Sequence, residues 1–87
     1  MRYRKHPNTA GRVVSGQAFV ITGEDNKLHG LNETASLIWQ LAQSGFSSDE
    51  AAKALASEFE VDAKTAKRDI DSCIADFVKR GILVAEE

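Results

Sequence analysis

Apolar residues in the first third of the chain occur in short runs that are separated by turn-forming residues. The pair Ser15-Gly16 precedes the run at 18–22, which is rich in β-branched and aromatic types. A second turn-forming segment occupies 23–26 and is followed by another short run. This pattern predicts a meander of three short antiparallel strands near residues 12–15, 17–22 and 27–31.

After residue 31 the apolar residues recur every three or four positions, which is the period of a helix. Each helical stretch begins at a good capping residue: Asn32, Ser47 and Asp62. Ser47 is followed three residues later by Glu50, the arrangement of a capping box. We therefore predict helices near 32–44, 47–60 and 62–80, and we expect 82–84 to pack back on them or form a short strand.

Three strands followed by three helices describe an α+β domain with a winged helix-turn-helix-like outline. We expect this domain to span 12–84, between a loose basic arm at 1–11 and a short tail at 85–87. Its core should combine the apolar stripes of the three helices. The residues expected there are Ile38, Trp39, Leu41, Leu55, Phe59, Ile70, Ile74 and Phe77.

The charge balance argues against nucleic acid as a partner. The 87 residues include 11 basic and 13 acidic ones, which gives a formal net charge of −2. DNA-binding proteins usually carry a basic excess, because neutralising phosphates supplies much of their affinity. The third predicted helix, which would enter the major groove, mixes basic residues with Asp69, Asp71 and Asp76. We therefore expect no nucleic-acid binding.

The residues that usually carry chemistry are few and scattered. The two histidines, His6 and His29, and the lone Cys73 show no metal-ligand spacing, and no glycine-rich phosphate loop occurs. Cys73 lies in an apolar stripe, where a thiol stays protonated. We expect no enzyme activity, no metal and no cofactor. A single cysteine and the lack of an apolar run of about 20 residues favour the cytoplasm and argue against a membrane partner.

The segment 28–35 reads LHGLNETA and is followed by IWQL at 38–41. These stretches closely resemble the PqqD-like family, in which a short strand leads into a helix with this motif. The later segments LASEFEVD at 55–62, RDI at 68–70 and FVKRGIL at 77–83 resemble the same family. The resemblance runs from about Gly11 to Leu83, with the elements in order.

The resemblance implies a recognition element for ribosomally made, post-translationally modified peptides. Family members fold as winged helix-turn-helix domains without binding DNA. They hold a leader peptide as an added strand beside the third strand, in a groove completed by the third helix. They present it to a radical-SAM or other tailoring enzyme, and the founding pathway makes pyrroloquinoline quinone.

The strand near 27–31 is the expected peptide edge, since an extended peptide can add a strand to an open sheet edge. Strict alternation puts Leu28 and Leu31 on opposite faces, unless Gly30 forms a bulge, so either Leu28 or His29 could face the peptide. On the third helix, Val78 shares a flank with Lys67 and Asp71, off the centre of the apolar stripe. The expected peptide-binding residues are Lys27, Leu28, His29, Lys67, Asp71 and Val78.

Several alternatives stay open at this point. Val78 could simply pack on Ile82 or Leu83, and the strand edge could be solvated or covered by the N-terminal arm. Two other functions compete with peptide binding: a DNA-binding winged helix and a dimerising structural domain that forms a homodimer.

Overall fold

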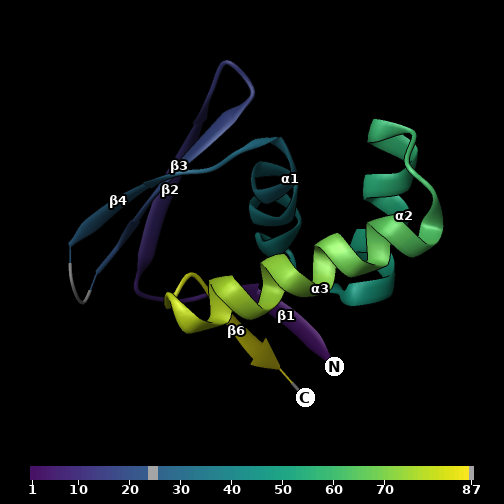
Figure 1. The fold of residues 1–87 in the computed structure, drawn as a ribbon. Coiled ribbons are helices and arrows are strands. Elements are labelled where there is room, and N and C mark those ends of the chain that lie inside the picture. Colours follow the sequence, from purple (N-terminus) through teal and green to yellow (C-terminus); the bar gives the residue numbers. More distant parts are fainter. Residues whose placement is uncertain (24–25, 87) are drawn as a thin grey trace.

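The computed structural model describes residues 1–23 and 26–86. The predicted α+β class and the order of strands before three helices are confirmed (Figure 1). The elements are β1 (Arg2–Lys5), β2 (Thr9–Val14), β3 (Gln17–Thr22), β4 (Lys27–Gly30), α1 (Glu33–Ala42), β5 (Phe46–Ser47), α2 (Ser48–Phe59), α3 (Ala63–Lys79) and β6 (Leu83–Glu86). Glu24 and Asp25, in the turn predicted at 23–26, lie outside the described residues.

The predicted meander is the sheet β2-β3-β4, with both strand pairs antiparallel. Its first hairpin has a two-residue loop, Ser15-Gly16, since Val14 pairs directly with Gln17. Both loop residues have positive φ, 52° and 81°, as a loop that matches the twist of the strands requires. A serine and a glycine tolerate this backbone far better than a β-branched residue would. The local turn chemistry therefore fixes the hairpin where the sequence predicts it.

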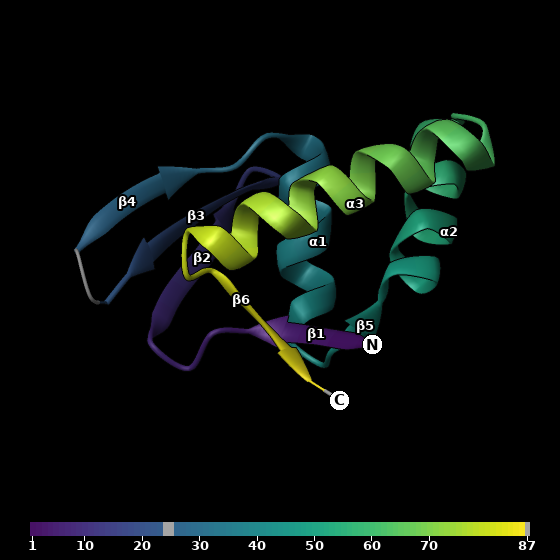
Figure 2. The same cartoon turned by 60° about the horizontal axis from the view of Figure 1, so that its bottom comes forward.

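The expectation of a loose arm at 1–11 is wrong for most of that segment. Residues 2–5 form β1, which lies between β5 and β6 in a second antiparallel sheet. The ring of Tyr3 packs against Phe46 with 5.9 Å between centroids, and Phe46 is buried. The predicted tail is also corrected, because β6 extends to Glu86 and pairs with Arg2. Both ends of the chain are thus held together (Figure 2).

The predicted helix starts are confirmed by their capping bonds. Asn32 Oδ1 accepts a hydrogen bond from the Ala35 N–H at 2.9 Å. Ser47 and Glu50 form the full capping box, and the Asp62 side chain accepts from the Thr65 N–H. Such bonds satisfy amide groups that have no partner inside the helix. The β4-to-α1 and α2-to-α3 joints are therefore set by local sequence.

The core lies between the two sheets and the three helices. Six of the eight predicted core residues are buried: Ile38, Trp39, Leu55, Ile70, Ile74 and Phe77. Leu41 and Phe59 were expected beside them but are only partly buried, packed on the edge of the cluster. Trp39 lies directly under β2. A Cβ on Gly11 would come within 2.9 Å of the Trp39 ring, so the glycine lets the sheet close over the indole.

Candidate functional site

The strand β4 forms one edge of the sheet β2-β3-β4. It carries no proline, and its pairing with β3 runs without interruption from Lys27 to Gly30. The bulge considered at Gly30 is therefore wrong. Strict alternation holds instead: Leu31 turns into the core and is 4% exposed, whereas Leu28 lies on the opposite face and is 66% exposed.

The register shows which backbone groups of β4 point to the open edge. The Leu31 N–H donates to the Ala18 carbonyl at 2.9 Å, so this pair is a hydrogen-bonded one. Hydrogen-bonded and non-hydrogen-bonded pairs alternate along an antiparallel ladder. Leu28 and Gly30, whose partners in β3 are Ile21 and Phe19, therefore direct their N–H and C=O groups away from β3. The edge can accept another strand.

The N-terminal segment does not occupy this edge. Its strand β1 pairs with β5 and β6 in the other sheet, which lies below the lower end of α1 and away from β4 in Figure 2. The alternative that the arm covers β4 is therefore excluded.

A recess of about 930 Å³ lies between β4 and the C-terminal end of α3. Lys27 and His29 line it from β4, and Val78 and Lys79 line it from α3. Thr22 Oγ1 lies 3.4 Å from His29 Nε2, so the imidazole sits against the core face of the sheet. Further lining comes from the connection between β1 and β2 and from β6. These residues are His6, Asn8, Leu83, Val84 and Ala85.

A second recess, of about 680 Å³, continues along the same helix. Its walls are the end of β4, the start of α1 and one flank of α3. Asp76 and Arg80 line both recesses, so the two adjoin. Together they form what we call the β4–α3 groove. It runs between an open strand edge and a helix, which suits an extended chain better than a compact small molecule.

Cys73 lines the second recess. Burial, and to a lesser extent the nearby carboxylate of Asp76, raises the pKa of the Cys73 thiol to about 11. A thiol with this pKa is protonated near neutral pH and is a poor nucleophile. The side chain therefore contributes a small apolar surface to the groove wall.

The structure brings three of the six predicted site residues together and separates the other three. Lys27, His29 and Val78 all line the larger recess. Val78 is 42% exposed, so packing on Ile82 or Leu83 does not account for its whole side chain. Leu28 belongs to β4 but projects from the outer face of the sheet, beside Ile21.

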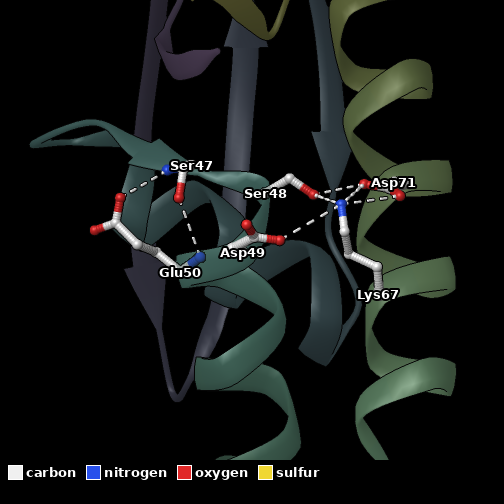
Figure 3. A network of polar contacts seen from close by, with 6 residues as sticks. All are labelled: Ser47, Ser48, Asp49, Glu50, Lys67 and Asp71. Atoms are coloured by element: carbon white, nitrogen blue, oxygen red, sulfur yellow. Dashed lines mark hydrogen bonds and ion pairs between the residues drawn. The ribbon is translucent and has the colours of Figure 1, made fainter.

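Lys67 and Asp71 lie on the side of α3 that faces the start of α2 (Figure 3). Asp71 Oδ1 accepts a hydrogen bond from the Ser48 hydroxyl at 2.6 Å, and Lys67 Nζ lies 3.1 Å from the same carboxylate. Lys67 also lies 3.8 Å from Asp49. The Ser48 hydroxyl and the Lys67 ammonium lower the pKa of Asp71. These two residues hold α2 and α3 together and do not line the β4–α3 groove.

The groove residues that the sequence prediction missed are on the opposite side of α3. Asp69, Ser72, Cys73, Asp76 and Arg80 line the smaller recess. Their spacing of three and four residues marks one helical flank, so the pattern was visible. What the sequence lacked was a signal telling which flank faces β4.

The described residues contain no group of three or more His, Cys, Asp or Glu side chains placed to hold a metal ion. Within the same residues, no helix is both long and apolar enough to cross a bilayer.

Fold and groove together define an α+β domain of the winged helix-turn-helix type with an open strand edge beside its third helix. The family model described as "Coenzyme PQQ synthesis protein D (PqqD)" matches residues 17–83, and the chain belongs to this family. A search of curated protein sequences gave no match.

Two solved structures have the same fold over nearly their whole length. One is described as "TbiB1 in Complex with the TbiA(beta) Leader Peptide". Its TM-score is 0.87 at 19% identity, covering 97% of this chain and 98% of the other. The second is described as "Lasso peptide synthetase B1 complexed with the leader peptide". Its TM-score is 0.82 at 28% identity, covering 95% and 98%.

Proposed function

We propose that the chain is a non-catalytic domain that binds the leader of a ribosomally made precursor peptide. It would present that peptide to a tailoring enzyme, such as a radical-SAM protein. The observation that carries the proposal is the open edge of β4 beside the groove along α3. Membership of the PqqD family and the two structural neighbours, each described as a complex with a leader peptide, support it.

The mechanism follows from the register of β4. An incoming extended peptide would exchange backbone hydrogen bonds with Leu28 and Gly30, whose N–H and C=O groups point to the edge. Backbone bonds give affinity without regard to sequence, and alternate side chains of the added strand give specificity. Side chains on one face of the peptide would enter the β4–α3 groove. Those on the other face would lie beside Leu28 and Ile21.

A binding role without catalysis agrees with the chemistry of the groove. Its cysteine has a raised pKa, and the ion pair between Asp76 and Arg80 joins neighbouring turns of α3 at 3.0 Å. We propose the cytoplasm as the location, because a single cysteine cannot form an internal disulfide.

The direct test titrates a candidate leader peptide, taken from any short open reading frame beside the chain's gene, into isotopically labelled protein. We expect amide shift changes at 27–31 and along the groove flank of α3, at 69–80. Random duplex DNA is the control ligand and should leave the spectrum unchanged. Shifts confined to α2 and β1, with β4 silent, would contradict the proposal.

A matched pair of variants tests the added strand itself. Leu28→Pro removes an N–H that points to the open edge, and proline is tolerated on edge strands, so β3–β4 pairing should survive. The peptide carbonyl left without a donor costs about 1–3 kcal/mol, which is roughly a fivefold to hundredfold loss of affinity. Leu28→Ala keeps the N–H and serves as the control. Equal affinities for the two variants would show that the peptide does not pair with β4.

A further inference from the structure

The two ends of the β4–α3 groove differ in charge. Among the described residues, the larger recess is lined by the cations Lys27, Lys79 and Arg80, by two histidines and by a single carboxylate, Asp76. Asp76 and Arg80 neutralise each other, with Oδ2 and Nε 3.0 Å apart. The described part of this wall therefore keeps a positive excess.

The remaining cations of this recess have no anionic partner in the described part of the chain. Within residues 1–23 and 26–86, no ion pair or hydrogen bond involves the ammonium groups of Lys27 or Lys79, whereas Arg2, Arg4, Lys67, Arg68 and Arg80 all have carboxylate partners. The histidine His6 accepts from the Asn8 N–H through Nδ1 at 3.0 Å, so the neutral ring carries its proton on Nε2. The recess thus offers donors and positive charge.

Strand geometry decides which peptide side chains would meet this surface. Lys27 and His29 pair with Thr22 and Val20, which are buried, so both side chains lie on the core face of the sheet. In a strand added to β4, every second side chain would share that face. Directly opposite side chains on neighbouring strands lie about 4.5–5.5 Å apart at Cβ. A side chain opposite Lys27 or His29 would therefore project into the recess.

We propose that the larger recess is a subsite for an acidic side chain, so that the preferred peptide carries Asp or Glu at the position facing Lys27 and His29. The inference rests on the proposed function, since it assumes a peptide on β4. It names Lys27 and Lys79 as specificity-determining residues. The same peptide carries uncharged residues on its other face, next to the exposed apolar pair Ile21 and Leu28.

The net charge of the chain distinguishes this preference from a general electrostatic attraction between protein and peptide. With a formal net charge of −2, the protein as a whole attracts cationic peptides more than anionic ones. A preference for acidic peptides must therefore come from a local surface and not from the overall field.

The test selects binders from a displayed pool of random dodecapeptides against the whole chain. Bound peptides are sequenced, and the best are titrated into labelled protein to show that 27–30 shift. Each is then compared with its Asp→Asn or Glu→Gln counterpart. The variant Lys27→Gln/Lys79→Gln removes the two lysines that line the larger recess. Its control, Lys53→Gln/Lys64→Gln, makes the same charge change at exposed positions of α2 and the first turn of α3.

We expect acidic residues to be enriched at one position of the groove-binding peptides. Their affinity should fall roughly fivefold to tenfold in Lys27→Gln/Lys79→Gln, as for two opposite-charge cross-strand pairs, and stay unchanged in the control. Peptides that bind at β4 without acidic enrichment would overturn this inference and leave the proposed function standing. A pool that yields no peptide binding at β4 would overturn both.

Discussion

The two flanks of α3 carry similar residues and lie in different surroundings. One flank, with Lys67 and Asp71, meets the start of α2, where Ser48 completes a polar network. The other, with Cys73, Asp76 and Arg80, faces the end of β4 and leaves a groove. Charged residues on a helix flank therefore do not mark a site by themselves. The difference lies in whether another element of the fold covers them.

A substitution in the apolar stripe between the two flanks should cause the largest loss of stability. Ile74 is 5% exposed and belongs to the core, so Ile74→Ala should lower the free energy of unfolding by about 2–5 kcal/mol through lost contacts and a cavity. Urea unfolding followed by tryptophan fluorescence, with Trp39 as reporter, measures it. A change below about 1 kcal/mol, typical of surface positions, would show that Ile74 is not a core residue.

The groove flank can be probed through Cys73. With the pKa raised to about 11, the thiol should react with iodoacetamide at pH 7.5 roughly tenfold more slowly than the same thiol in urea, even though a thiolate of higher pKa is more nucleophilic. The rate should keep rising with pH up to about 11. A groove-bound peptide should slow it further. Labelling at the same rate in folded and unfolded protein would show that the Cys73 thiol is not partly buried and protonated in the groove wall.

A substitution on the flank of α3 that faces α2 should cause the smallest change in stability and in peptide affinity. Asp71→Asn breaks a half-exposed network and should cost less than about 1 kcal/mol of stability, with peptide affinity unchanged. The folded pKa of Asp71 is lowered, by the Ser48 hydroxyl and then by Lys67. The wild-type advantage is therefore present above the unfolded pKa of about 3.9 and is lost as the pH falls below it. Denaturation at pH 7 and pH 3 measures this difference.

Asp76→Asn on the groove flank is the matched variant for Asp71→Asn. It too removes an exposed carboxylate and should change stability by less than about 1 kcal/mol, but it alters the groove wall. If Asp71→Asn changes peptide affinity as much as Asp76→Asn does, the division into a structural flank and a peptide-binding flank is wrong.

The features that the sequence predicted are those set by neighbouring residues. The capping box at Ser47 and Glu50, the caps at Asn32 and Asp62, and the turn at Ser15-Gly16 each depend on atoms within three residues of one another. Strands β2, β3 and β4 follow in succession with short connections, so their pairing is local as well. Such elements can be predicted from the sequence because the preferences of neighbouring residues agree with the fold.

The second sheet depends on distant partners. β1 has Tyr3 among charged residues and no strand signal of its own, and it is held by β6 at the other end of the chain, where Arg2 pairs with Glu86. No residue close to Arg2 in the sequence indicates this pairing. Which flank of α3 lies beside β4 could not be predicted for the same reason. Helical period places Lys67, Asp71 and Val78 on one flank, but which flank meets β4 depends on how the helix crosses the sheet.

The pairing of β1 with β6 also bears on how the domain tolerates being joined to something else. The two strands are antiparallel neighbours, and both ends emerge from one corner of the molecule. A unit built this way can be inserted into a surface loop of another protein, or circularly permuted, without stretching its sheet. The β4 edge lies away from that corner (Figure 2), so attachment there would leave the strand edge itself free.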